Sequence, residues 1–198
     1  MSDTLFALPR RCRYQQEIKK SRFLATAEAV RSGEQALALL RELADPAASH
    51  NCWAYRIGQD YRFNDDGEPG GSAGRPILQA IENQAMDRVL VVVTRWYGGV
   101  KLGVGGLARA YGGTAAECLR QAERVPIVSM TRLGLCCAFA ELALLKARLK
   151  ELDAEVESEQ FQADGVQLCL LLPEARVAEA EQLIGNLTRG GSIAKRLD

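Results

Sequence analysis

Residues 89–111 read VLVVVTRWYGGVKLGVGGLARAY. The first part, Val89 to Thr94, is a continuous apolar run rich in β-branched residues, which is typical of a strand buried on both faces of a sheet. A glycine-rich loop over residues 95–106 follows it, and a helix is expected over 107–122. A buried strand that leads through such a loop into a helix predicts a domain in which helices pack against a sheet.

The residues upstream supply the remaining elements of this first domain. Hydrophobic periodicity and turn residues predict, in order, a strand over 22–30, a helix over 33–44, a hairpin over 50–57 and 61–63, a polar loop over 64–75, and a helix from Pro76 to about Met86.

A second domain is expected after Val125-Pro126, which has the composition of a linker. The predicted elements are a strand over 129–136, a helix over 141–152, a hairpin over 155–161 and 166–172, a helix over 174–187 and a strand over 192–197. This order, βαββαβ, is the ferredoxin-like plan, so we expect an α+β protein with domains 1–126 and 127–198. Residues 1–127 carry 17 basic and 14 acidic side chains, and residues 128–198 carry 8 and 11.

The composition is that of an ordinary globular protein. Hydrophobic residues make up 47% of the 198 residues. The formal net charge is 0, so the overall charge does not attract nucleic acid, although a local basic surface is still compatible with the composition. No apolar run approaches the roughly 20 residues of a membrane span, and residues 1–13 lack the apolar core of a signal peptide. We therefore expect a cytoplasmic protein with no membrane partner.

The cysteines and the histidine do not have the spacing of a metal site. The six cysteines form no C-x-x-C pair and His50 is the single histidine, so we expect buried free thiols and no bound metal. His50 and Cys52 would share one face of a strand. A Cys–His dyad needs hydrogen-bond reach that spacing alone does not show, and we favour a structural pair.

The glycine-rich loop over 95–106 has the residue types of an anion or nucleic-acid site. Gly105-Gly106 would lie at a helix start, where free N–H groups and the helix dipole attract anions. Basic side chains and aromatic faces would add charge and stacking. The candidates are Arg95, Trp96, Tyr97, Lys101, Gly105, Gly106 and Arg109. The alternative is that these glycines only let the helix pack closely on the sheet.

A second polar loop, over 64–75, carries Asp65, Asp66 and Glu68, followed by glycines and Arg75. Carboxylates and loop carbonyls suit Mg²⁺ or Ca²⁺, but the EF-hand spacing is missing. We favour a solvated turn whose acids pair with arginines. Because Asp65, Asp66 and Glu68 need positive neighbours such as Arg75, Arg95 and Lys101, we expect the two loops to lie side by side at one edge of the sheet.

Lys20, Arg22 and His50 are further surface candidates, although the basic residues near the N-terminus are interpreted first as a solvated edge. The phosphate-loop motif fails, because Val104 replaces its lysine, and the G-x-G-x-x-A match at 103–108 lacks the βαβ context.

Four stretches together resemble the IMPACT family. They are Lys20-Ser21-Arg22-Phe23, His50-Asn51-Cys52-Trp53-Ala54-Tyr55, the acidic stretch over 65–74, and the stretch from Val91 through Arg109-Ala110-Tyr111. The resemblance, closest to the bacterial YigZ-like branch, implies a first domain with the fold of the second domain of ribosomal protein S5. It implies a ferredoxin-like second domain, and the pair is similar to the last two domains of elongation factor G.

The resemblance also implies a function in translation. Eukaryotic members regulate translation by interfering with activation of the amino-acid-starvation kinase. We expect this chain to lack their separate N-terminal interaction domain, and no catalytic residue carries over. We expect a translation-associated protein that contacts RNA, ribosome or a phosphate-bearing partner through the two loops. The alternatives are an enzyme that acts on a phosphorylated small molecule or nucleotide with Mg²⁺ held by the acidic loop, and a protein-interaction module.

Overall fold

The computed structural model describes residues 4–197. The chain divides after Ile127 into two compact units, each with helices packed on its own antiparallel sheet. The expected α+β class is therefore confirmed.

The N-terminal unit is built on a five-stranded sheet of order β2-β3-β6-β4-β5. Its strands are β2 (Cys12–Ile18), β3 (Ser21–Ala29), β4 (His50–Ile57), β5 (Asp60–Asn64) and β6 (Val89–Trp96). All neighbours are antiparallel. The apolar run at 89–94 forms the central strand, and only the last residue of β6 is not fully buried.

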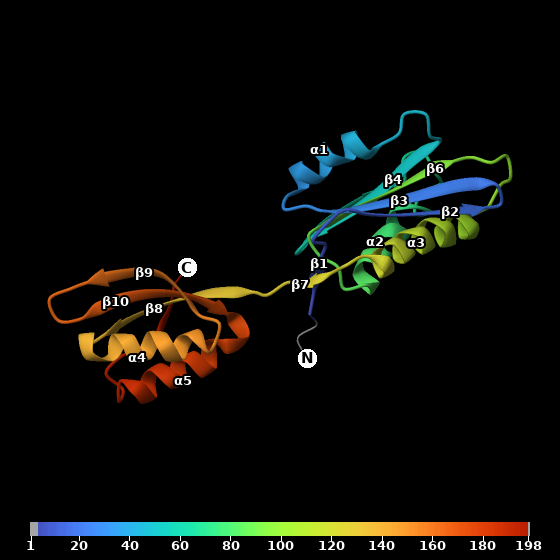
Figure 1. Ribbon diagram of the computed structural model, residues 1–198. Helices are drawn as coiled ribbons and strands as arrows, with labels where there is room; N and C mark the ends of the chain where they lie inside the picture. The colour runs from blue at the N-terminus through green and yellow to red at the C-terminus, as the bar shows by residue number, and fades with distance from the viewer. Residues whose placement is uncertain (1–3, 198) are drawn as a thin grey trace. The chain divides into compact units, whose positions relative to one another are not determined.

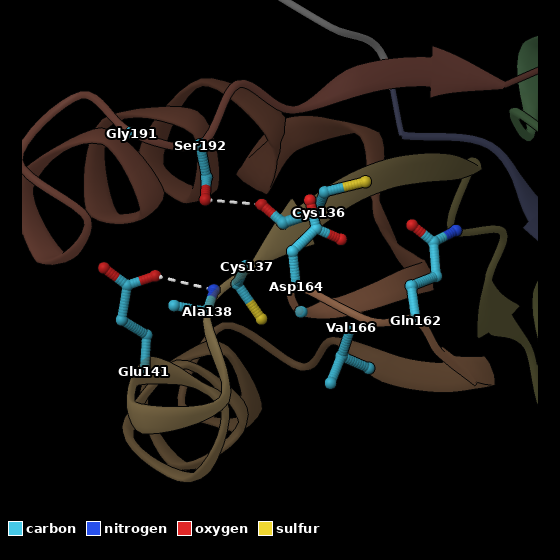
Figure 2. Close-up of a pocket in the computed structure, with 10 residues that line it drawn as sticks. Cys136, Cys137, Ala138, Glu141, Gln162, Asp164, Val166, Gly191 and Ser192 are labelled. Atoms are coloured by element: carbon cyan, nitrogen blue, oxygen red, sulfur yellow. Dashed lines mark hydrogen bonds between the residues drawn. The ribbon is translucent and has the colours of Figure 1, made fainter.

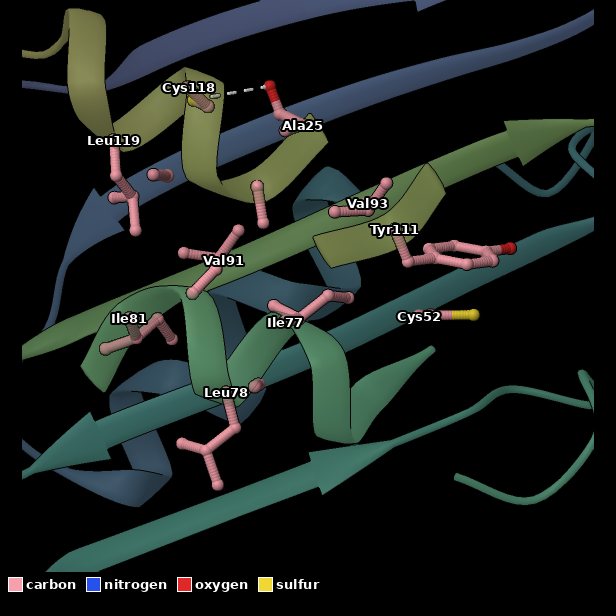
Figure 3. Packing of buried hydrophobic residues seen from close by; sticks show 14 of the residues in the cluster. Ala25, Cys52, Ile77, Leu78, Ile81, Val91, Val93, Tyr111, Cys118 and Leu119 are labelled. Carbon is pink, nitrogen blue, oxygen red and sulfur yellow. Dashed lines mark hydrogen bonds between the residues drawn. The ribbon is translucent and has the colours of Figure 1, made fainter. Parts of the chain in front are cut away.

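Helices cover both faces of this sheet (Figure 1). The pair α2 (Gly74–Asn83) and α3 (Val104–Gln121) packs on one face, and α1 (Gly33–Leu43) packs on the other. Figure 3 shows the larger core, where Ile77 and Ile81 of α2 and Tyr111 of α3 lie against Val91 and Val93 of β6.

Several boundaries differ from those predicted. Strand β2 was not expected, β6 continues two residues beyond Thr94, and α3 begins at Val104 rather than Leu107. Helix α2 begins at Gly74, so Pro76 lies within its first turn. The extension of β6 matters most for the site, because it places Arg95 in a buried strand instead of a loop.

Val125-Pro126, expected as a linker, is strand β7 and pairs with β1 (Phe6–Ala7) inside the N-terminal unit. Ile127 N–H also donates to the Leu5 carbonyl at 2.8 Å. The two ends of the first unit are thus hydrogen-bonded together, and the division into units falls one residue after the predicted boundary.

The C-terminal unit has the predicted βαββαβ order. Its elements are β8 (Met130–Cys137), α4 (Phe139–Lys150), β9 (Glu155–Phe161), β10 (Val166–Pro173), a short 3-10 turn η1 (Glu174–Arg176), α5 (Val177–Leu187) and β11 (Lys195–Leu197). The sheet order is β11-β8-β10-β9, and apolar side chains of one face pack against α4 and α5. Among residues 4–197, no helix is long and apolar enough to span a membrane.

Candidate functional site

Two loops meet at one end of the five-stranded sheet. The acidic loop (residues 65–73) follows β5, and the glycine loop (residues 97–103) follows β6. The end of β6 lies beside the starts of β3 and β4, because Trp96 pairs with Arg22 and Arg95 with His50. Both loops line one pocket of about 430 Å³, so they lie side by side.

Glu68 of the acidic loop lies at the floor of this pocket. Its side chain is only 4% exposed. Arg95 Nη1 donates to Glu68 Oε1 at 2.6 Å, and the Tyr111 hydroxyl donates to the same oxygen at 2.7 Å. A buried carboxylate is tolerated when a cation and hydrogen bonds compensate it, and both are present here.

Arg95 is consequently not a surface cation, contrary to the sequence-based expectation. Its side chain is 6% exposed, and its Nη2 donates to Ser21 Oγ at 3.4 Å. Its Nε atom is buried without a hydrogen-bond partner among the described residues. Arg95 therefore compensates the charge of Glu68 and holds that side chain in place beneath the pocket.

His50 lies beside this pair with a defined tautomer. Its Nδ1 is 2.7 Å from the backbone carbonyl of Asp66. Since a carbonyl oxygen only accepts, Nδ1 carries the proton, and Nε2 is an acceptor when the ring is neutral. His50 Nε2 lies 3.8 Å from Glu68 Oε1 and the side chain is 26% exposed.

The other carboxylates of the acidic loop bond to backbone N–H groups, not to arginines as expected. Asp65 accepts from Gly71, Ala73 and Gly74 at 2.8 to 2.9 Å, which satisfies amides at the start of α2. Asp66 accepts from the Asn51 N–H.

The expected pairing of Arg75 with these acids is also absent. Arg75 lies 6.0 Å from the ring centroid of Phe63 instead, and within residues 4–197 no group of three or more His, Cys, Asp or Glu is arranged to hold a metal. Hydrogen bonds from backbone N–H groups thus stabilise the acidic loop.

Cys52 is unsuited to act as a nucleophile with His50. Its thiol donates to the Asp65 carbonyl at 3.0 Å, and burial raises its pKa to about 12. Because the thiolate is the reactive form, this thiol is inert near neutral pH. The pair is structural, as we favoured.

The start of α3 offers unpaired backbone donors. Gly103 precedes the helix with a φ of 72° and no side chain caps it. The first helical hydrogen bond there runs from Leu107 N–H to the Gly103 carbonyl, so the amides of Val104, Gly105 and Gly106 have no partner within the helix.

Two cations are near these amides. Lys101 lines the pocket, and Arg109 Nη1 would lie 3.5 Å from a Cβ placed on Gly105. The first turn of α3 contains no acidic residue.

The aromatic candidates differ in availability. Tyr97 is 49% exposed and lines the pocket, with Arg95 5.3 Å from its ring centroid. Trp96 is covered on one face by Arg22, whose guanidinium carbon lies 3.8 Å from the ring centroid. Tyr97 is therefore the more exposed of the two rings, and stacking by Trp96 stays a prediction.

The turn between β2 and β3 belongs to the same end of the unit. A Cβ on Gly98 would lie 1.9 Å from the Lys20 carbonyl oxygen, so the glycine loop rests directly on this turn. The turn places Lys20 and Arg22, both exposed, near the glycine loop. Sequence reasoning missed the supporting role of Ser21. It gave Tyr111 as a stacking face, whereas the ring is buried and its hydroxyl donates to Glu68.

A second pocket, of about 360 Å³, lies in the C-terminal unit (Figure 2). Its polar groups bond mainly to each other: Ser192 Oγ donates to the Cys136 carbonyl, and Ala138 N–H donates to Glu141. It lacks the buried, compensated charge found beneath the first pocket, so the N-terminal unit carries the candidate site.

These features define a two-unit α+β protein with a polar pocket at one end of its first sheet. The family model described as the Impact N-terminal domain matches residues 19–119, and a domain of unknown function, DUF1949, matches residues 135–190. The chain belongs to the IMPACT family, as the sequence motifs indicated.

The relatives support this over nearly the whole chain. An IMPACT family member of Thermus thermophilus is 46% identical over 174 residues, covering 87% of this chain and 96% of that protein. The IMPACT family member YigZ of Escherichia coli is 36% identical, covering 88% and 89%. A crystal structure of a hypothetical protein aligns with a TM-score of 0.67 at 32% identity, covering 100% of this chain and 99% of that one. Eukaryotic proteins named IMPACT match only 43% of this chain.

Proposed function

We propose that this protein is a translation-associated regulatory protein that contacts RNA through the pocket end of its N-terminal unit. The observation that carries the proposal is the start of α3, where the amides of Val104, Gly105 and Gly106 have no helical partner and Lys101 and Arg109 lie close by. Free amides, the positive end of a helix dipole and cations together favour phosphate.

The charge balance around this helix start supports the same function. Lys20 and Arg22 contribute positive charge from the adjoining turn. Glu68 is already paired with Arg95. Asp65 and Asp66 keep their negative charge although backbone amides donate to them, but four exposed cations at this end outnumber them: Lys20, Arg22, Lys101 and Arg109. The net field at this end therefore attracts phosphates.

Family membership supports the regulatory part of the proposal. The family model described as the Impact N-terminal domain matches residues 19–119, which contain the pocket, and the eukaryotic IMPACT proteins match 43% of this chain. The resemblance to these proteins supports the proposed regulation of translation, and the geometry of the pocket end supports the proposed contact with RNA.

The test is a salt titration with a short single-stranded RNA. Lys101→Ala should weaken binding for all sequences and lower the salt slope by about 0.7, because one phosphate contact is lost. Tyr97→Ala should weaken binding by about 1–3 kcal/mol through lost stacking and leave the slope unchanged. Lys150→Ala, an exposed lysine of the C-terminal unit, is the matched control and should equal wild type. Salt-independent affinity, or equal binding by all three variants, would reject RNA contact here.

A second candidate function is an enzyme acting on a phosphorylated small molecule or nucleotide. The enclosed floor of the pocket, with His50 and Glu68 3.8 Å apart, is the observation that favours it. Thermal melting with ATP and Mg²⁺ distinguishes the two functions, since a nucleotide-dependent rise in melting temperature without RNA binding would support the enzyme.

A further inference from the structure

The floor of the pocket presents a carboxylate oxygen without a partner. Glu68 Oε1 accepts from both Arg95 and Tyr111, whereas Glu68 Oε2 accepts no hydrogen bond from any residue in the described range 4–197. Oε2 is also absent from the fully buried unpartnered atoms, of which Arg95 Nε alone is found in that range. Oε2 therefore keeps some exposed surface, and the pocket that Glu68 lines is where a ligand would meet it.

His50 adds a second acceptor on the same floor. Its Nδ1 donates to the Asp66 carbonyl, so in the neutral form of the ring the lone pair of Nε2 lies beside Glu68. Both residues line the pocket. A ligand that fits this floor must offer two neighbouring hydrogen-bond donors.

The charge of the floor selects a neutral ligand edge. Arg95 already compensates Glu68 at 2.6 Å, so the pair has no net charge to attract an ammonium or guanidinium group. Neutral N–H donors satisfy the open oxygen without adding an unpaired buried charge.

The rest of the pocket suits a flat apolar ring that carries a phosphate. Pro69, Leu102 and Leu107 are apolar lining residues, and Tyr97 offers a half-exposed aromatic face. Lys101 and the free amides of α3 lie at the glycine loop, where a phosphate would bind.

We propose that the pocket binds one unpaired guanine of the RNA, with its Watson–Crick edge on Glu68 and His50 and its phosphate at the start of α3. This inference rests on the proposed function. Guanine presents N1–H and the N2 amino group side by side, and two acceptors match that edge. Adenine and cytosine each offer one donor group beside an acceptor, and uracil offers a single N–H.

The experiment measures the affinity of oligouridylates that carry one central guanine, inosine, adenine or cytosine. The guanine oligonucleotide should bind roughly 5- to 150-fold more tightly than the adenine or cytosine one. Inosine, which lacks only the N2 amino group, should lose much of that preference. Free guanosine monophosphate in the same assay distinguishes RNA from a free nucleotide as the source of the base.

A variant that closes the pocket tests the location. Val104 lines the pocket and is 59% exposed, so Val104→Trp should obstruct the pocket without disturbing the core. It should abolish the guanine preference, so that the guanine and adenine oligonucleotides bind with equal affinity. Val128→Trp, at a 55% exposed valine of the other unit, is the matched control.

The outcomes separate the two proposals. RNA binding with a normal salt slope but equal affinity for all four bases overturns the guanine pocket and leaves the proposed function standing. A guanine preference that survives Val104→Trp also overturns it. Absence of binding to every RNA overturns the proposed function, and tight binding of guanosine monophosphate without RNA binding overturns RNA as the source.

Discussion

Glu68 and Arg95 determine how the pocket end of the molecule is organised at the scale of single residues. Both side chains are almost fully buried and lie 2.6 Å apart, and Tyr111 also donates to Glu68. Such a pair contributes little net stability compared with apolar residues, but removing one partner leaves an uncompensated buried charge. Arg95 thus stabilises the charged Glu68 carboxylate at the floor of the pocket.

Arg95→Ala should lower the free energy of unfolding of the N-terminal unit by about 3–5 kcal/mol, because Glu68 would be left buried and charged. The measurement is urea denaturation followed by tryptophan fluorescence. Arg109→Ala, which removes an exposed arginine of α3, is the control and should change stability by less than about 0.5 kcal/mol. An Arg95→Ala protein as stable as this control would show that the ion pair does not organise the site.

At the scale of elements, the sequence predicted the central strand well and the edge strand badly. The run at 89–94 is apolar throughout, and continuous burial is the strongest strand pattern. Strand β2 alternates between half-buried and exposed residues, but Gln16 occupies an inward position and bonds to Thr114 Oγ1 at 2.7 Å. A polar residue on the inner face breaks the alternation of apolar and polar residues that indicates a strand. The basic residues of this segment therefore predicted only a solvated edge.

The site was predictable in part for a related reason. The loops that form it could be chosen from their glycines and charges, and both line the pocket. The hydrogen-bond partners of individual side chains could not be predicted, because they depend on strand register. The pairing of Arg95 with His50 across β6 and β4 places Arg95 near Glu68. Composition also could not show that backbone amides satisfy Asp65.

Gly98 joins two elements, and its replacement tests that contact. Gly98→Ala should destabilise the N-terminal unit or displace the glycine loop, because the added Cβ would lie 1.9 Å from the Lys20 carbonyl. Gly113→Ala, within α3 and with open space around a Cβ, should instead raise the free energy of unfolding by about 0.5–1 kcal/mol. Denaturation of both variants, with RNA affinity as a second readout, checks the opposite signs. Equal effects of the two substitutions would mean that the loop does not rest on the β2–β3 turn.

At the scale of the whole molecule, the two units differ in charge as well as fold. Residues 1–127 have a net charge of +3 and residues 128–198 a net charge of −3, from 17 basic and 14 acidic against 8 basic and 11 acidic side chains. Within residues 4–197 the buried cores share no residue: the sheet and helices of the first unit enclose two clusters, and those of the second enclose one. The charge difference is consistent with our proposal that phosphate binds to the first unit.

Each unit produced alone should fold, because each buries its own core and β1 pairs with β7 to close the first unit on itself. At the usual 0.05–0.15 kcal/mol per residue, the second unit, of about 70 residues, should unfold cooperatively with a stability of about 4–11 kcal/mol. Residues 1–127 should keep the RNA affinity and salt slope of the full chain, and residues 128–198 should not bind, since repulsion by their net negative charge opposes phosphate. Denaturation and RNA titration of the three proteins check this. Cooperative folding of both pieces with RNA binding only in the full chain would place the binding surface across both units and contradict a site confined to the first.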